Sequence, residues 1–157
     1  MSTLKAVDVA NYIYVKYLRE HHAKIDEMKM HKLLYFTQRE SLIQTDTFMF
    51  DEVFYGWKYG PVLKEVRNLY KCNAFAENFD KVIASEQKKI IDAVYKQYSN
   101  KNSWSLSNLT HNEYSWKQSR KGLSEYDNGD VAIDSNDIRK DALLQKMQRM
   151  LNSSTEK

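Results

Sequence analysis

The chain contains very little cysteine, proline or glycine. Its 157 residues include one Cys, one Pro and four Gly. A single cysteine excludes an intrachain disulfide and a cysteine-based zinc cluster, and this composition is typical of proteins in a reducing compartment. Because residues that break helices are scarce and Lys, Glu, Gln and Leu are common, the composition favours helix.

Long apolar runs and a strong charge of one sign are also missing. No stretch approaches the roughly 20 apolar residues of a membrane span. Lys5, Asp8 and Lys16 interrupt the apolar segment that a signal peptide would need. We therefore expect a cytoplasmic protein without membrane contact. The net charge of +3 does not by itself indicate nucleic-acid binding, since the basic residues are spread along the chain.

Standard catalytic and cofactor motifs are absent as well. The chain has no glycine-rich phosphate loop, no nucleophile elbow and no His-Glu-x-x-His sequence. We predict no catalytic residue, no cofactor and no metal. His21, His22 and His31 are interpreted as solvated surface residues rather than metal ligands, and Cys72 as a small buried residue rather than a nucleophile. The pair Asp51–Glu52 is interpreted as solvated rather than cation-binding.

Periodic apolar positions predict one compact domain of about six to eight helices over residues 1–151, with a polar tail over 152–157. The fold class is all-α or mainly α, with a short irregular or β segment left open near residues 48–56. Helices are expected over roughly 3–20, 26–44, 85–98, 104–110 and 114–121, with one more starting near 61 and another near 134. Their expected details are caps at Asp26 and Ser85, inward-facing Leu106 and Leu109, and a last helix that buries Ile138, Leu143, Met147 and Met150.

The run from Trp57 to Val62 contains the only proline, directly after a glycine. Glycine adopts backbone angles that other residues avoid, and proline suits the first turn of a helix. We therefore interpret Gly60 and Pro61 as a rigid turn that starts a helix near Pro61. The aromatic residues Trp57 and Tyr59 before this turn are either core anchors or part of a binding surface.

A second informative stretch runs from Leu109 to Arg120. Thr110 and Glu113 have the spacing of a capping box at the start of a short helix. Trp116, Lys117 and Arg120 would then share one helix face, because positions three and four apart are neighbours. The alternative is a Trp buried between helices, with the Lys and Arg side chains in water.

These stretches together resemble the Panacea domain family, also described as SocA-like or phage-associated GepA-like. Lys32 to Gln38 is similar to the family's KLLYFAQ helix, and Trp57 to Val62 is similar to its WKYGPV run. Phe50-Asp51-Glu52 matches the lead-in to that run, and Val7 to Ile13 resembles the N-terminal helix. Leu109-Thr110-His111 and Trp116-Lys117-x-x-Arg120 resemble the motif LTH…PWK-x-x-R, except that Ser115 replaces the proline before Trp116.

The resemblance implies a mainly helical, non-enzymatic antitoxin that binds and neutralises a cognate protein toxin. Two alternatives stay open: an adaptor that delivers a toxin to an AAA+ protease, and a DNA-binding autorepressor. An enzyme that uses His111 and Glu113 as an acid–base pair is the least favoured function, since no nucleophile or metal accompanies the pair. A hypothetical partner-facing groove combines the two motif clusters, and its residues are Trp57, Lys58, Tyr59, His111, Trp116, Lys117 and Arg120.

Overall fold

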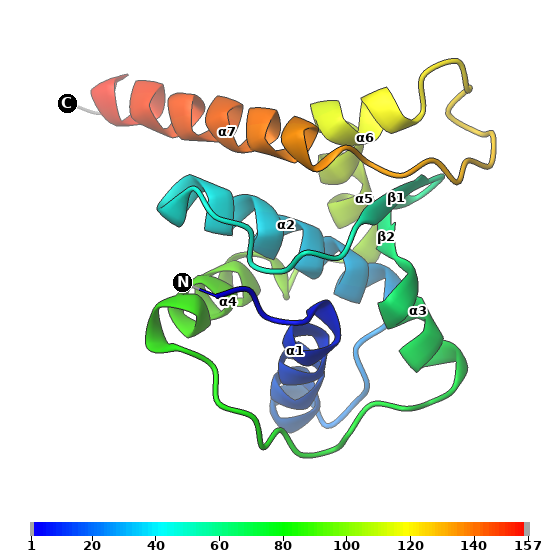
Figure 1. Ribbon diagram of the computed structural model, residues 1–157, viewed down its shortest axis with the longest axis vertical. Helices are drawn as coiled ribbons and strands as arrows, with labels where there is room; N and C mark the ends of the chain where they lie inside the picture. Colours follow the sequence, from blue (N-terminus) through cyan, green and yellow to red (C-terminus); the bar gives the residue numbers. More distant parts are fainter. Residues whose placement is uncertain (1, 156–157) are drawn as a thin grey trace.

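The computed structural model of the chain describes residues 2–155 (Figure 1). Within these residues the chain forms seven helices and one two-stranded sheet, which confirms the mainly helical prediction. None of the helices in residues 2–155 has the length and apolar character needed to cross a bilayer. The helices are α1 (Ala6–His21), α2 (Glu27–Thr45), α3 (Lys64–Lys71), α4 (Ser85–Tyr98), α5 (Ser103–His111), α6 (Tyr114–Ser119) and α7 (Ser135–Thr155), and the strands are β1 (Phe54–Trp57) and β2 (Gly60–Leu63).

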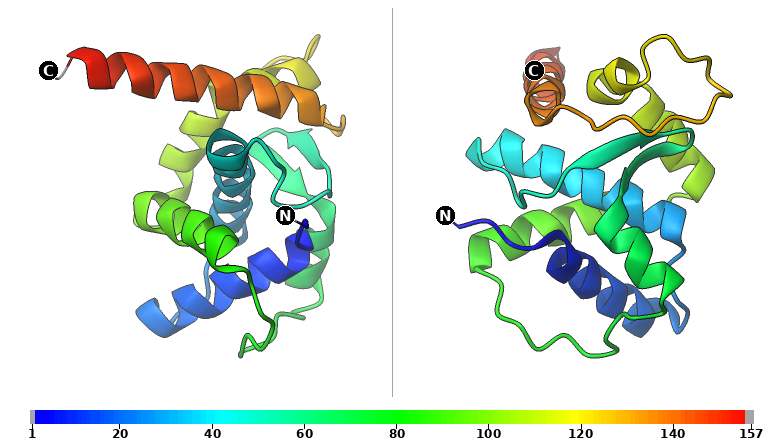
Figure 2. Two further views of the ribbon diagram at one scale, coloured as in Figure 1. Left: turned by 60° about the vertical axis from the view of Figure 1, so that its left-hand side comes forward. Right: turned by 45° about the vertical axis from the view of Figure 1, so that its right-hand side comes forward.

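Helix α2 is the central element, with α7 on one side and α1 and α4 on the other (Figures 1 and 2). It begins at the predicted cap, where Asp26 accepts a hydrogen bond of 2.9 Å from the Lys29 N–H. The Phe36 ring stacks on Tyr98 of α4 with 4.3 Å between ring centroids. The predicted apolar faces of α1 and α4 are buried against this helix, as are residues Met30, Leu33, Leu34, Tyr35 and Phe36 of α2 itself.

Several polar residues of α2 are buried too, and partners from other segments satisfy Gln38 and Tyr35. The Gln38 side chain donates to Phe50 O at 2.7 Å and accepts from Met49 N at 2.7 Å, which fixes the segment before the hairpin. The Tyr35 hydroxyl donates to Asp141 of α7 at 3.1 Å. Burial of such groups is tolerated only when each is hydrogen-bonded, so these contacts determine how α2 is oriented.

The run from Trp57 to Val62 is a hairpin rather than a turn into a helix, so the prediction of a helix near Pro61 was wrong. Gly60 pairs with Trp57 and lies in β2, and α3 begins only at Lys64. The fixed φ of Pro61 and the extended backbone that precedes a proline suit a strand as well as a helix start. The backbone of residues 131–133 hydrogen-bonds to the other edge of β1, through Val131 O with Gly56 N at 2.9 Å and through Ile133 N with Phe54 O at 2.8 Å.

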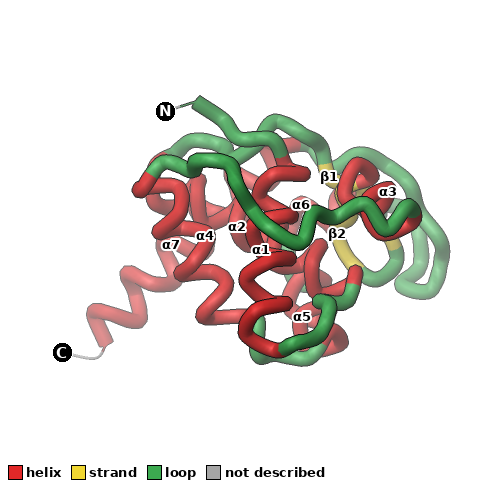
Figure 3. Tube along the Cα trace, turned by 90° about the horizontal axis from the view of Figure 1, so that it is seen from below, coloured by secondary structure: helices red, strands yellow, loops and turns green. Residues whose placement is uncertain are grey.

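The segment between α3 and α4 is a long loop that crosses α1 (Figure 3). Phe75 stacks on Tyr14 with centroids 4.5 Å apart, and Phe79 meets Tyr12 edge-on at 5.5 Å. Both Phe side chains are partly buried, as predicted. Ser85 is the first residue of α4 but not its cap, since Ala84 occupies that position without a side-chain hydrogen bond.

Helix α7 extends beyond the body of the molecule toward its C-terminal end (Figures 1 and 2). Ile138 is buried as predicted, but Leu143, Met147 and Met150 are more than half exposed, so their predicted burial was wrong. Leu109 of α5 is also exposed rather than inward-facing. A periodic apolar face predicts burial only when another element covers it, and none does so here within residues 2–155. Helix α7 includes residues 152–155 of the polar tail, and residues 156–157 lie outside the described residues.

Candidate functional site

The two motif clusters that are distant in the sequence lie together in the structure. The Trp116 indole N–H of α6 donates to Trp57 O at 2.8 Å, and Arg120 Nη1 donates to Gly56 O at 3.1 Å. The His111 ring stacks on Trp116 with 4.1 Å between centroids. Trp116 is 7% exposed, so its main contribution is to hold α6 against the hairpin.

Arg120 is buried, which contradicts the expectation that it lies in water. Its guanidinium donates to the carbonyl oxygens of Ser124 and Asp127 as well as to the hairpin, and it lies over the Trp116 ring at 5.1 Å. A charged group can be buried when hydrogen-bond acceptors surround it, and here loop carbonyls supply them. Arg120 therefore positions the loop that follows α6, whereas Lys117 is exposed as expected.

The outer side of the hairpin tip presents two aromatic rings to solvent. Tyr59 is 46% exposed and Trp104 of α5 is 61% exposed, and their rings meet edge-on with centroids 5.4 Å apart. The Lys58 ammonium lies 5.4 Å from the centre of the Tyr59 ring. Ser107 Oγ donates to Tyr59 O at 2.7 Å, which attaches the turn to α5. We call Lys58, Tyr59 and Trp104 the hairpin-tip surface. Trp104 is not among the site residues predicted from the sequence, because it belongs to no recognised motif and only its residue type suggests an interface.

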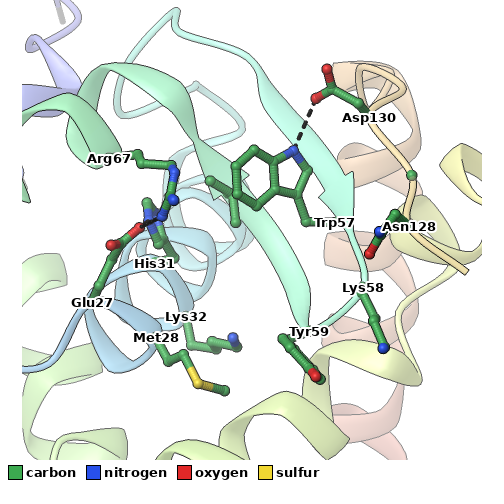
Figure 4. Close-up of a pocket in the computed structure, with 12 residues that line it drawn as sticks. Glu27, Met28, His31, Lys32, Trp57, Lys58, Tyr59, Arg67, Asn128 and Asp130 are labelled. Atoms are coloured by element: carbon green, nitrogen blue, oxygen red, sulfur yellow. Dashed lines mark hydrogen bonds and ion pairs between the residues drawn. The ribbon is translucent and has the colours of Figure 1, made fainter. Parts of the chain in front are cut away.

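A pocket of about 570 Å³ lies on the inner side of the hairpin (Figure 4). The Trp57 side chain forms one wall, and its indole N–H donates to Asp130 at 2.9 Å. Lys64 donates to the same carboxylate at 3.1 Å, and these two donors lower the pKa of Asp130. The remaining walls come from the first turns of α2, the hairpin, α3 and the loop over 128–130, through Glu27, Met28, His31, Lys32, Lys58, Tyr59, Val62, Arg67, Asn128 and Gly129.

The inner edge of the pocket contains a buried histidine rather than the surface histidine expected at position 31. His31 Nδ1 accepts from Leu63 N at 3.3 Å, so the Nε2 nitrogen carries the proton and faces Glu27 at 3.0 Å. Burial lowers the pKa of His31, which keeps the ring neutral near pH 7. Burial favours a higher pKa for Glu27, but the hydrogen bonds from His31 and Arg67 outweigh it and lower the value. This network joins α2, α3 and β2.

Lys32 differs from Arg67 and Lys64 because it has no ion pair, and from Lys58 because it is almost completely buried. Its side chain is 1% exposed, and within residues 2–155 its ammonium makes no hydrogen bond or ion pair. Burial lowers the pKa of Lys32 to about 8, against a smaller opposing effect of Asp26 and Glu27. Figure 4 shows the ammonium directed toward the open space beside Tyr59. At neutral pH the pocket therefore contains an unpaired positive charge.

Residues 30–117, more than half of the chain, match the family described as antitoxin SocA-like, Panacea domain. The chain belongs to this family of SocA-like antitoxins. No curated protein and no solved structure matches it. The matched residues include every predicted site residue except Arg120, which lies three positions beyond the match. An antitoxin-type function and a toxin partner follow from membership in general terms.

Ser115 stands where the Panacea motif often has proline, and hydrogen bonds fix the chain there in place of the ring. Ser115 N donates to Asp141 Oδ2 at 2.8 Å, a bond that proline cannot make. The Ser115 hydroxyl is 2.8 Å from the Tyr35 hydroxyl, and Tyr114 N donates to Asp141 Oδ1 at 2.8 Å. Asp141 of α7 thus caps α6 from outside, and the start of α6 is well fixed despite the substitution.

The predicted capping box of this Panacea domain does not form. Thr110 lies in α5 and donates to Ser107 O at 2.9 Å, and Glu113 accepts from Arg39 instead of capping α6. Burial raises the pKa of Glu113, Arg39 opposes the rise, and the Asp141 carboxylate adds to it. No hydrogen bond joins Glu113 to His111 in the part of the chain that the structure describes, so an acid–base pair of these residues has no geometric support.

The remaining candidate sites also have structural explanations. Glu52 accepts from Ala6 N at 2.6 Å and so binds the first turn of α1. Cys72 is exposed at the end of α3, not buried as expected, because the chain turns outward there into the long loop. His21 stacks on Tyr17 at 4.1 Å. The described residues contain no cluster of three or more His, Cys, Asp or Glu side chains able to hold a metal.

Proposed function

We propose that the chain neutralises its cognate toxin by direct contact through the hairpin-tip surface of Lys58, Tyr59 and Trp104. Family membership supports the antitoxin class, and the exposed Tyr59–Trp104 pair is the observation that supports this location. Trp and Tyr are the residues most enriched at the centres of protein interfaces, because each buries a large apolar area at a small entropic cost. An aromatic pair that solvent reaches in the free protein is available for such burial.

The residues behind this surface have a different role in the proposal. Trp116 and His111 support the hairpin from α6 and α5, and Ser107 holds the turn, so the tip is organised before a partner arrives. A preorganised surface binds more tightly because less conformational entropy is lost on association. Lys58 and the exposed Lys117 are proposed as rim cations that favour a partner with an acidic border.

The experiment compares the Tyr59→Ala/Trp104→Ala double variant with Tyr126→Ala. Tyr126 is 75% exposed and lies outside the hairpin-tip surface, so Tyr126→Ala controls for the loss of an exposed aromatic ring. The product of the neighbouring reading frame is co-expressed as the candidate toxin, and growth rescue and the Kd of the complex are measured. Truncation of a hot-spot aromatic residue typically weakens binding by about 2 kcal/mol or more, or about 30-fold.

We expect the double variant to lose rescue and at least this much affinity while its thermal midpoint is unchanged, and Tyr126→Ala to behave as wild type. Rescue and affinity retained by the double variant would exclude the hairpin tip as the contact surface. Toxin abundance in the rescued cells separates the mechanisms. It stays constant under direct neutralisation, whereas delivery to an AAA+ protease lowers it.

A further inference from the structure

The unpaired Lys32 ammonium in the pocket calls for a counter-charge that the described residues do not supply. Two neighbouring cations are compensated, since Arg67 pairs with Glu27 at 2.9 Å and Lys64 pairs with Asp130 at 3.1 Å. Lys58 lies against the Tyr59 ring and is only partly buried. An ammonium group with very little exposed surface and no protein partner is unfavourable, because it keeps little hydration and gains no ion pair in return. Charged residues are almost never fully buried unless they are paired.

The local backbone is shaped to leave room for this side chain. Gly60 has φ of +128°, and a Cβ added there would lie 3.0 Å from Lys32 Cε. The glycine thus allows the lysine stem to pass directly under the hairpin and to direct its ammonium into the pocket (Figure 4). Both α2 and the hairpin are held by buried hydrogen bonds, including the one between His31 and Leu63, so the pocket is preformed.

The pocket wall near Lys32 includes apolar and aromatic side chains beside the paired carboxylate of Glu27. Met28, Trp57, Tyr59 and Val62 line it, and the volume of about 570 Å³ is within the range of roughly 300–1,000 Å³ that is usual for small-molecule sites. This space is larger than a single inorganic anion requires. A cation at the base and aromatic walls around it select a molecule with an acidic group and a flat apolar body.

We propose that this pocket binds a small organic anion whose carboxylate or phosphate pairs with the Lys32 ammonium and whose aromatic body packs against Trp57, Tyr59 and Met28. The pocket lies beside the hairpin-tip surface and shares Lys58 and Tyr59 with it. Its existence does not depend on the identity of the toxin or on the antitoxin proposal.

The test uses three probes at pH 7 in calorimetric titrations: indole-3-acetate, its neutral analogue indole-3-acetamide, and AMP. The first two have nearly the same shape, so their comparison isolates the charge, and AMP tests phosphate against carboxylate. We expect at least one anion to bind, and the neutral analogue to bind at least about tenfold more weakly than indole-3-acetate if the carboxylate is the preferred group. Preference for AMP instead identifies phosphate. If neither anion binds, the proposal is overturned.

Variants provide the second arm of the test. Lys32→Met should weaken binding of the preferred anion at least about tenfold, and Lys121→Met, at an exposed position, should bind it as wild type does. Unchanged binding by Lys32→Met would also overturn the proposal. In wild-type protein the anion should shift the NMR signals of the Met28 methyl group and the Trp57 indole N–H. Shifts confined to other residues would place the probe elsewhere and refute the site independently of any variant.

Discussion

Replacing Lys32 by Met should make the ligand-free protein more stable at neutral pH. Methionine has a similar length and a flexible thioether, so it can occupy the same path without a charge. Burial lowers the pKa of Lys32 from 10.5 to about 8. Each pKa unit corresponds to 1.36 kcal/mol, so the charged side chain destabilises the folded state by about 3 kcal/mol. Lys32→Met removes this cost.

The pH dependence distinguishes this explanation from a general packing effect. Below pH 8 the lysine is charged in both states, and its full cost is present in the wild type. Between pH 8 and 10.5 the unfolded chain binds more protons than the folded one, so wild-type stability rises with pH relative to the variant. The advantage of Lys32→Met should therefore fall from about 3 kcal/mol at pH 7 to below about 1 kcal/mol at pH 10.

Urea denaturation at both pH values, followed by circular dichroism, measures these differences. The control is Lys121→Met, which removes an exposed lysine and should change the free energy of unfolding by less than about 0.5 kcal/mol. A variant less stable than wild type at pH 7 would refute the reasoning. A constant advantage across the two pH values would also do so, because it would show that the charge is not the cause.

Three further changes test the buried contacts. Arg39→Met leaves Glu113 buried without its cation and should lower the free energy of unfolding by about 3–5 kcal/mol, measured by urea denaturation. Adding Glu113→Leu should restore most of this loss. A loss below about 1 kcal/mol for the single change would contradict this prediction. Asp141→Ala removes the acceptor of the first two amides of α6, so stability should fall by about 2 kcal/mol and both amides should exchange hydrogen faster. Gly60→Ala combines an unfavourable φ with a Cβ 2.8 Å from Thr110 Oγ1 and should cost about 2 kcal/mol in thermal denaturation, and a neutral result would refute this backbone geometry.

Local patterns in the sequence predicted α1 and α4 well, because each has one buried face and a polar opposite face. The apolar faces of these two helices could be found in this way, and so could the Asp26 cap at the start of α2. The central helix could not be described so fully. Residues such as Gln38 and Arg39 have the composition of a solvated face, and they are buried because partners in other segments reach them.

The hairpin and the last helix also show where prediction from local sequence fails. Gly60 and Pro61 fit both a turn and a strand, and the pairing with β1 decides between these structures. Leu143 and Met147 have helical apolar spacing, yet their exposure depends on whether another segment covers them. In each case the deciding factor is whether another segment pairs with or covers these residues, and their own type and spacing do not specify this.

For the candidate site, family resemblance brought together two clusters that spacing alone could not join. The contact between Trp57 and Trp116 follows from the fold. The burial of Arg120 could not be predicted, because its acceptors are main-chain carbonyls of a loop that has no distinctive sequence. Lys32 was recognised only as part of a helix motif, and its lack of a partner is a property of the three-dimensional packing.

The contacts of α2 with α7 also determine when the fold is completed during synthesis. Tyr35 and Glu40 bind residues 106 and 109 positions later in the chain, Asp141 and Arg149. Ribosomes add about 5–20 residues per second, so these two residues of α2 wait roughly 5–20 s for their partners. Until then the side of α2 that packs against α7 lacks this cover. Each new molecule therefore completes the contacts of its central helix only after nearly the whole chain has been translated.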